Sequence, residues 1–251
     1  MNEDIKEIKN SLCEYQELLN KEENLKSDKW YSLINKTGWL LHIQSAINTA
    51  NLLLESFKAG KTILVHSELG KDRVALISSL ALALFDPYYR TMKGFEVLIE
   101  REFISFGHQF RTRLANCQEN GMNRKDYVPI FLLLLDCIYQ TMIQAPLAFE
   151  FNQRFLKKLA VHSQTLKFGT FLNNNDIERD AWNTRLGTIS IWRYIEYYKK
   201  DKYLNKLYDR ELSISPLNVN PIPSKLVVWT SLYLRWIPPT VISKEDYPNE
   251  M

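Results

Sequence analysis

The scarcity of turn-forming residues is the sequence feature that most limits how this chain can fold. Its 251 residues include only 8 glycines and 9 prolines, whereas average usage predicts about 18 and about 13. Turns between many short strands depend heavily on these two residue types. The composition therefore favours long helices, in a chain whose length suits one large domain or two small ones.

Apolar residues recur at three- and four-residue steps along most of the chain, which predicts amphipathic helices. The first spans residues 5–19, and a second spans residues 40–57 and ends at Gly60, as expected of a glycine C-cap. Further helices are predicted at residues 73–85, 94–106, 129–144, 152–164 and 188–198. Irregular segments are predicted at residues 116–126, 173–176 and 213–223, and a last apolar element at residues 225–236.

One short segment interrupts the helical periodicity. Residues 62–65 have the sequence Thr-Ile-Leu-Val, a β-branched and apolar run that predicts a buried strand extending to His66. Helix, strand, loop and helix then alternate as in an α/β unit with a parallel sheet. The sequence thus predicts a helix-rich α/β fold.

Charge and cysteine content exclude several classes of protein. The 32 basic and 29 acidic residues leave a net charge of +3, which is too small to indicate bulk nucleic-acid binding. Cys13, Cys117 and Cys137 form no Cys-x-x-Cys pair, which indicates free thiols in a reducing compartment. No apolar run approaches the ~20 residues that span a bilayer, and the first residues do not resemble a secretory signal. We expect a cytoplasmic protein that is at most peripheral at membranes, without a transmembrane segment.

Other residues of the types that often form sites are scattered along the chain. No carboxylate or cysteine lies at metal-ligand spacing from the four histidines, so we expect core or interface roles, and neither metal nor cofactor, for His42, His66, His108 and His162. Glu150 is flanked by aromatic residues and is predicted to brace the fold rather than to react. Trp192, Trp229 and Trp236 lie in helical or apolar surroundings and are predicted to be core residues.

The candidate chemistry lies in the loop at residues 66–73, between the predicted strand and the helix that follows it. Backbone N–H groups of a tight turn, together with a helix N-terminus, can bind an anion. Gly70 permits close approach to a phosphate, and the guanidinium of Arg73 at the helix start suits phosphate oxygens. An ordinary turn whose arginine pairs with a carboxylate remains the alternative from these residues alone.

A series of stretches carries a resemblance that runs in order from about residue 5 to about residue 238. They are residues 39–43, 65–66, 72–73, 86–91, 94–100, 105–108, 135–137, 149–152, 168–171, 190–192 and 232–236. With a loop that ends in arginine, as in the Cys-x5-Arg signature, they resemble the myotubularins, which are phosphoinositide 3-phosphatases. The resemblance implies a partial, cysteine-phosphatase-like domain at residues 1–238 with a truncated central sheet, and a loose tail at residues 239–251.

The loop departs from the family pattern where the chemistry would take place. The family has the order His-Cys-Ser-Asp-Gly-Trp-Asp-Arg-Thr, and Ser67 stands at the position of the nucleophilic cysteine. Positions that also differ are Glu68, Leu69, Lys71 and Val74, whereas Gly70, Asp72 and Arg73 match. Such a loop lowers the pKa of a cysteine to give a thiolate, but a serine hydroxyl stays protonated at neutral pH. The resemblance therefore implies a catalytically inactive pseudophosphatase.

The resemblance also implies roles for individual residues. Ser67 takes the nucleophile position, Asp72 that of the proposed general acid, and Arg73 that of the phosphate-clamping arginine. The implied phosphate-binding residues are Glu68, Leu69, Gly70, Lys71, Arg73 and Arg113. Gln109 stands where a further basic residue is expected, so binding of a phosphoinositide headgroup should be weakened. In the alternative interpretation, Asp72 and Arg73 only brace the loop.

Three functions remain open from the sequence. The favoured one is an inactive domain that regulates or scaffolds an active phosphoinositide phosphatase. The others are an active phosphatidylinositol 3-phosphate phosphatase whose cysteine was replaced by Ser67, and a phosphoinositide-binding module without turnover. Association with an active myotubularin or self-association is expected, because two apolar surfaces would need cover: the strand edge at residues 62–66 and the stripe Leu40, Ile43, Ile47 and Leu54.

Overall fold

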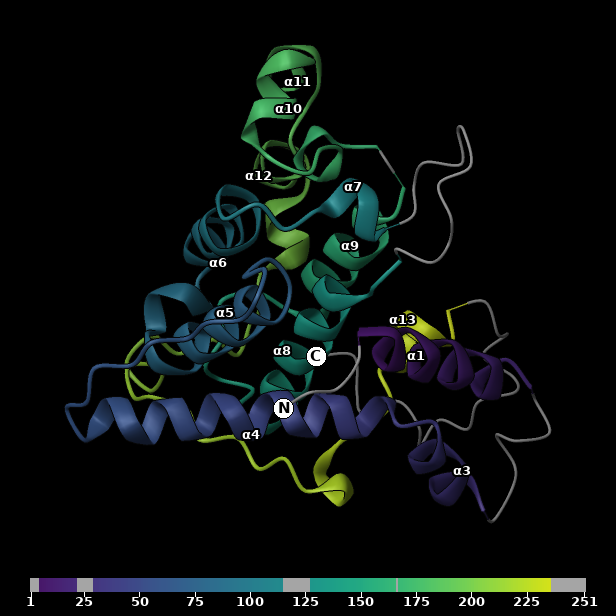
Figure 1. The fold of residues 1–251 in the computed structure, drawn as a ribbon. Helices are drawn as coiled ribbons and strands as arrows, with labels where there is room; N and C mark the ends of the chain where they lie inside the picture. Colours follow the sequence, from purple (N-terminus) through teal and green to yellow (C-terminus); the bar gives the residue numbers. More distant parts are fainter. Residues whose placement is uncertain (1–4, 22–28, 115–126, 166, 236–251) are drawn as a thin grey trace.

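The computed structural model describes residues 5–21, 29–114, 127–165 and 167–235 and is built almost entirely from helices (Figure 1). In chain order the elements are α1 (Ile5–Leu19), α3 (Trp30–Lys36), α4 (Trp39–Lys58), α5 (Arg73–Phe85), η1 (Pro87–Arg90), α6 (Met92–Ile99), the π-helix η2 (Glu100–Ser105), α7 (Phe110–Arg113), α8 (Ile130–Gln144), α9 (Gln153–Ser163), η4 (Gly169–Phe171), α10 (Asp176–Ala181), α11 (Thr184–Gly187), α12 (Ile191–Tyr203), η5 (Pro223–Lys225) and α13 (Thr230–Tyr233).

The predicted helices are present, and two of them, α1 and α5, have the predicted ends. The predicted helix at residues 94–106 is divided between α6 and η2. Gly60 follows α4 with φ +72°, a left-handed conformation that glycine adopts without a steric penalty, so the predicted C-cap is confirmed. Four short helices were not predicted: α3, α7, α10 and α11.

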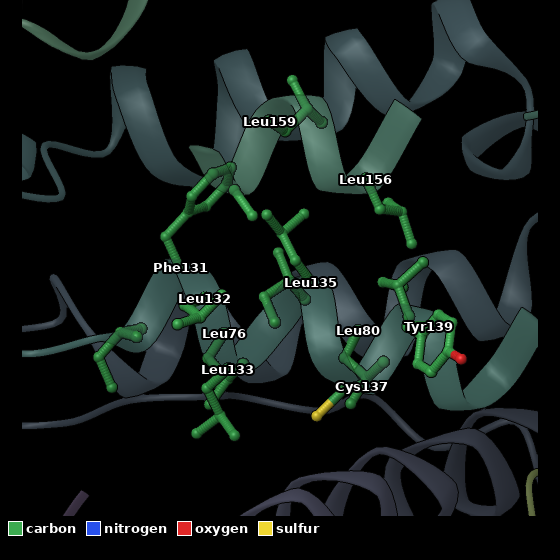
Figure 2. Packing of buried hydrophobic residues seen from close by; sticks show 14 of the residues in the cluster. Leu76, Leu80, Phe131, Leu132, Leu133, Leu135, Cys137, Tyr139, Leu156 and Leu159 are labelled. Atoms are coloured by element: carbon green, nitrogen blue, oxygen red, sulfur yellow. The ribbon is translucent and has the colours of Figure 1, made fainter. Parts of the chain in front are cut away.

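Helix α8 lies at the centre of the packing. Its residues 130–141 are all buried, as expected of a helix that is largely apolar around its circumference. Figure 2 shows its side chains meeting Leu156 and Leu159 of α9 and Leu76 and Leu80 of α5. Helix α5 also packs against α4, which crosses one edge of the molecule in Figure 1. Helix α5, which begins at the candidate loop, is therefore held between α4 and α8.

One carboxylate is buried inside this apolar core. Asp136 of α8 accepts hydrogen bonds from the indole of Trp39 (2.9 Å), the hydroxyl of Tyr233 (2.8 Å) and Nε2 of Gln140 (3.0 Å). Burial raises the pKa of Asp136, and the three donors oppose that rise. Because Trp39 begins α4 and Tyr233 ends α13, this carboxylate fixes both elements against the central helix.

A buried arginine fixes the irregular segment that precedes η5. The guanidinium of Arg90 donates to the carbonyls of Ala83 and Leu84 at the end of α5, each at 3.0 Å. It also donates to the carbonyls of Ser213 and, at 3.0 Å, Ser215. Burial lowers the pKa of Arg90 to about 10, so the group remains charged at neutral pH. The predicted irregular segment is confirmed, and Arg90 is the residue that attaches it to the core.

The predicted strand at residues 62–66 is wrong. These residues have no regular secondary structure, and Leu64 is 83% exposed. A strand forms only when a neighbouring strand accepts and donates its backbone hydrogen bonds. Within the described residues, the β pairing consists of one isolated antiparallel bridge between Phe151 and Leu204. The described part of the chain is thus helix-rich and lacks the sheet that an α/β class requires.

The apolar stripe predicted to need an external partner is covered by the chain itself. Helices α1, α5 and α8 pack against α4. The four residues of the stripe are all buried: Leu40, Ile43, Ile47 and Leu54. The prediction that this stripe supplies a contact with another molecule is therefore wrong.

Several single residues lie as predicted. Trp192 and Trp229 are buried, and Glu150 braces the fold because its Oε2 accepts the N–H of Met92 at the start of α6 (2.7 Å). Trp236, Cys117 and the segments predicted at residues 116–126 and 239–251 lie outside the described residues. Of the helices that the structure describes, none combines the length and the apolar character needed to cross a bilayer.

The substitution Asp136→Asn tests the buried carboxylate. We expect a loss of about 1–3 kcal/mol in the free energy of unfolding, because an amide offers one oxygen to three donors and leaves at least one unsatisfied. The pKa of Asp136 is raised in the folded state, so its ionisation weakens the wild type as pH rises above about 4. The difference between wild type and variant should therefore shrink from pH 4.5 to pH 7 in urea denaturation. A difference that grows with pH would contradict this account.

Candidate functional site

The loop at residues 66–73 is separated from α4 by residues 59–65 and leads directly into α5, whose first residue is Arg73. Ser67, Glu68 and Leu69 are exposed, whereas Lys71 and Arg73 are half-buried. Gly70 has φ +66°, and its N–H donates to Oγ of Ser67 at 3.1 Å. The loop therefore forms a turn in which the serine hydroxyl accepts a hydrogen bond. The N–H of Gly70 is occupied by this bond and does not point to a ligand.

Asp72 is the buried residue of the loop and is clamped from helix α7. Its Oδ2 lies 2.8 Å from Nη2 of Arg113, and its Oδ1 lies 3.2 Å from Nε of the same arginine. Two parallel contacts of this kind form the bidentate pair that suits a guanidinium and a carboxylate. Both side chains are largely removed from solvent. Arg113 thus joins α7 to the loop by engaging Asp72.

A histidine completes the clamp. Nδ1 of His108 lies 2.9 Å from the carbonyl oxygen of Lys71 and 3.1 Å from Oδ1 of Asp72. Because a carbonyl only accepts, Nδ1 carries the hydrogen and donates it toward the loop. The rings of Phe103 and Phe110 contact the imidazole edge to face, with centroids 5.1 and 4.8 Å away. His108 therefore holds both a loop carbonyl and the loop carboxylate in fixed positions.

The environment of Asp72 decides which proton chemistry it can perform. Burial by itself would raise the pKa of the Asp72 carboxyl, but hydrogen bonds and charges from His108 and Arg113 lower it below its usual value. The carboxyl is thus ionised at neutral pH and carries no proton to donate. A general acid must be protonated when it acts.

The structure brings together some of the residues predicted for the site and not others. Asp72, Arg73 and Arg113 lie within one cluster at the start of α5. Gln109 precedes α7 and is half-buried. His108 is buried, as predicted, but its contact with Asp72 was not predicted, because a histidine 36 residues from its partner gives no local signal. Among the described residues, no group of His, Cys, Asp and Glu side chains could hold a metal ion.

A cavity of about 220 Å³ lies apart from the loop. Its lining comes from α1, α8, α9, α13 and the residues that follow them, and includes Gln16, Leu132, Ala160 and Tyr233. No residue of the loop at 66–73 contributes to it. The cavity therefore has no part in the candidate site.

Comparison with known proteins identifies this helix-rich domain as a member of a phosphatase class. The model of the myotubularin-like phosphatase domain matches residues 2–180. The chain belongs to the myotubularin-like phosphatase family, as the resemblance predicted.

The relatives support this assignment over most of the chain. Myotubularin of Xenopus laevis is 39% identical over 218 residues, which are 86% of this chain and 35% of that protein. Human myotubularin-related protein 9 is 37% identical over 212 residues, 83% of this chain and 38% of that protein. The phosphatidylinositol-3,5-bisphosphate 3-phosphatase MTMR6 of Caenorhabditis elegans is 35% identical over 209 residues, 83% of this chain and 31% of that protein. The chain spans about a third of the length of these relatives.

The substitution Arg113→Gln tests the clamp on Asp72. We expect a loss of about 3 kcal/mol in the free energy of unfolding at pH 7, because a buried charge loses its bidentate partner. The folded-state pKa of Asp72 is lowered, so the stability that its pairing provides is present above the unfolded pKa of about 3.9 and is lost as pH falls below it. The difference between wild type and variant should therefore shrink below about pH 4 in urea denaturation.

The matched control is Arg111→Gln on the same helix. The Nη1 of Arg111 lies 3.9 Å from its carboxylate neighbour Glu178, and both side chains are partly exposed. Its loss should cost under about 1 kcal/mol. Equal effects of the two substitutions would show that Asp72 does not depend on Arg113.

Proposed function

We propose that this chain is a catalytically inactive myotubularin-like domain that regulates or scaffolds an active phosphoinositide phosphatase. We take residues 1–238 as one partial domain and residues 239–251 as a tail. The observation that carries the proposal is Ser67 at the nucleophile position. Its hydroxyl is exposed and accepts the Gly70 amide, and nothing in its described contacts would remove its proton.

The state of Asp72 gives independent support for inactivity. In a phosphatase of this class the residue at this position is the proposed general acid, which must donate a proton to the leaving oxygen. Here the carboxylate is buried, paired with Arg113 and ionised. The loop thus lacks an activated nucleophile, and the lowered pKa of Asp72 disfavours the protonated form that a general acid needs, so attack on phosphorus and protonation of the leaving oxygen are both disfavoured.

The same contacts support weak rather than strong headgroup binding. Arg113 is one of the residues implied to hold ring phosphates, but its guanidinium is engaged with Asp72. Gln109 offers no positive charge at the other position, and Glu68 adds a negative one at the exposed side of the loop. A charge-assisted contact is worth roughly 1.5–3 kcal/mol when it forms. Binding of a phosphoinositide headgroup, though weakened, would then depend mainly on Arg73 and the loop amides.

Phosphate release from vesicles that contain phosphatidylinositol 3-phosphate or its 3,5-bisphosphate tests this proposal. We expect release at the level of a protein-free blank for the wild type and for Arg73→Ala. Ser67→Cys should restore little, because Glu68, Leu69 and Lys71 also depart from the working loop and Asp72 carries no proton. Wild-type turnover that disappears in Arg73→Ala would refute the proposal, and near-complete rescue by Ser67→Cys would favour an active phosphatase whose cysteine was replaced.

The surface that we propose for association with an active relative, or with a second copy, is the segment at residues 62–66. Its side chains alternate in exposure, with Thr62, Leu64 and His66 outward and Ile63 and Val65 partly covered. This period of two is that of a strand lying on a protein surface. An added strand would cover Leu64 and satisfy the backbone groups of the segment.

The substitution Leu64→Asp tests this surface. We expect wild-type protein to self-associate at tens of micromolar or to co-purify with a co-expressed active myotubularin, and the variant to lose that association at least tenfold, because a charge would be buried at the contact. Leu212→Asp, at a leucine that is 65% exposed, is the matched control and should behave as wild type. A wild type that sediments as a monomer and captures no relative would refute the partner proposal.

A further inference from the structure

Helices α10 and α11 form a hairpin at one extremity of the molecule, where they project from the body of the domain (Figure 1). Its large apolar side chains point into solvent: Ile177 is 81% exposed and Leu186 is 89% exposed. Trp182 and Ile189 are also more than half exposed. The buried residues of the hairpin are instead polar, namely Arg179 and Thr184. The hairpin therefore exposes apolar side chains and buries polar ones, which is the reverse of the usual pattern.

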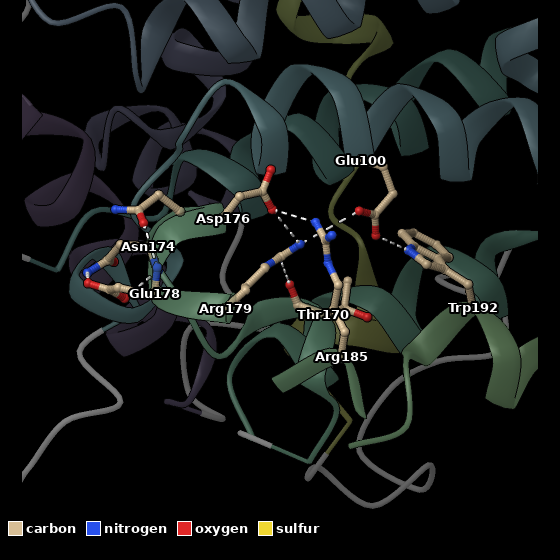
Figure 3. Close-up of polar contacts among 9 residues, drawn as sticks. Glu100, Thr170, Asn174, Asp176, Glu178, Arg179, Arg185 and Trp192 are labelled. Carbon is tan, nitrogen blue, oxygen red and sulfur yellow. Dashed lines mark hydrogen bonds and ion pairs between the residues drawn. The ribbon is translucent and has the colours of Figure 1, made fainter. Parts of the chain in front are cut away.

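Polar contacts, rather than an apolar core, hold the hairpin in place. Figure 3 shows Arg179 directed toward the body of the domain, where its Nη2 donates to the carbonyl of Thr170 at 2.6 Å. Its Nη1 lies 3.8 Å from carboxylate oxygens of both Glu100 and Asp176. Glu100 in turn accepts the indole N–H of Trp192 at 2.7 Å. These contacts anchor α10 to η2 and α12.

A second set of contacts fixes the other side of the hairpin to α7. The N–H of Thr112 donates to Oδ1 of Asn174 at 3.0 Å, and the backbone N–H of Asn174 donates to Glu178 at 2.9 Å. The guanidinium of Arg111 lies 4.4 Å from the centre of the Trp182 ring. The exposed apolar side chains thus stand on a platform that is tied down on two sides.

This arrangement has a physical cost in water. Burial of the Arg179 guanidinium removes its hydration, while the exposed isoleucines, leucine and tryptophan gain nothing from burial. Large exposed apolar side chains gathered on one projecting hairpin are typical of a contact with another molecule or with a membrane. We propose that the α10–α11 hairpin, through Ile177, Trp182 and Leu186, inserts into the interface of a zwitterionic lipid bilayer.

Shape and charge favour lipid over a protein partner. The hairpin is a projection, which can enter between lipid headgroups, whereas a stable protein interface buries more than about 1,000 Å² of complementary surface. The charged residues on and beside the hairpin show no excess of positive charge: Asp176, Glu178, Asp180 and Glu100 face Arg111, Arg179 and Arg185. Without a basic surface to attract anionic lipids, apolar insertion into a zwitterionic bilayer is the mode of binding that remains, and a partly exposed tryptophan suits the boundary between headgroups and acyl chains.

Insertion of the hairpin would also position the loop at residues 66–73, because α7 links the two. Helix α7 contacts both, through Arg111 on Trp182 and through Arg113 on Asp72. An inserted hairpin would hold α7, and with it the loop at residues 66–73, in a fixed relation to the membrane. This last step rests on the proposed function, since it matters only if the loop meets a phosphoinositide headgroup.

Sedimentation with vesicles of pure phosphatidylcholine tests the insertion without involving headgroup recognition. We expect the wild type to bind, and the double variant Ile177→Ser, Leu186→Ser to bind at least tenfold more weakly, because both side chains are exposed and leave the membrane contact without disturbing the core. The matched control is Leu212→Ser, Ile214→Ser, which removes two side chains that are 65% and 63% exposed and should bind as wild type. Binding should be the same at low and high salt, because apolar insertion is not screened.

Tryptophan fluorescence gives a second measurement, which reports how deeply Trp182 enters the bilayer. Lipids brominated on the acyl chain should quench part of the tryptophan emission, and Trp182→Phe should abolish that quenching while the protein still binds. Absence of wild-type binding, an equal loss in the control, or binding that falls steeply with salt would overturn the proposal. Self-association that the Ile177→Ser, Leu186→Ser variant abolishes, without vesicle binding, would identify the hairpin as a protein interface instead.

Discussion

The hydrogen-bonded carboxylate of Asp136 is the constraint on which the arrangement of the helices depends. Apolar packing is non-directional, and a core of leucine, isoleucine and phenylalanine tolerates small shifts of one helix along another. A shift that separated a buried carboxylate from its hydrogen-bond donors would leave its charge unsatisfied, which costs several kcal/mol in such a core. The donors Trp39 and Tyr233 therefore fix the start of α4 and the end of α13 to one point of α8. Tyr15 packs edge to face on Tyr233 and extends the same constraint to α1.

The position of the candidate loop is set by the helices that pack around α8. Helix α4 delivers the chain to the loop and α5 carries it away, and both pack against α8. At the other side of the loop, α7 reaches Asp72 through Arg113 while His108 holds the preceding carbonyl. The loop is thus held at its C-terminal end by directional contacts, whereas Ser67, Glu68 and Leu69 face solvent.

An element could be predicted correctly when the sequence pattern that defines it lies within the element itself. Helices α1 and α5 could be predicted to their ends, because the apolar periodicity that defines each helix lies within its own segment. The strand at residues 62–66 could not, because its β-branched pattern says nothing about whether another strand lies beside it. Helix α10 was missed since its apolar residue faces out and its arginine faces in, which is the reverse of the pattern that predicts an amphipathic helix.

The site shows the same division between local and distant signals. Asp72 and Arg73 could be singled out from their place beside Gly70 at the start of a helix. The contacts of Asp72 with His108 and Arg113 could not be predicted, because these residues lie 36 and 41 positions further along the chain, although the family resemblance had already implied a phosphate-binding role for Arg113. The pairing of Asp72 with Arg113 and His108 became evident only in three dimensions, and it supports the alternative in which Asp72 braces the loop.

Physical roles explain which loop positions match the family and which do not. Gly70 provides a left-handed turn, Asp72 is buried in an ion pair and Arg73 begins α5 half-buried, so a change at any of the three would disturb the fold. The positions that differ are Ser67, Glu68, Leu69, Lys71 and Val74, which are exposed or half-buried. In the inactive domain that we propose, no thiolate chemistry would restrain the positions that differ. The three matching positions have structural roles, so their match to the family pattern is not by itself evidence of catalysis.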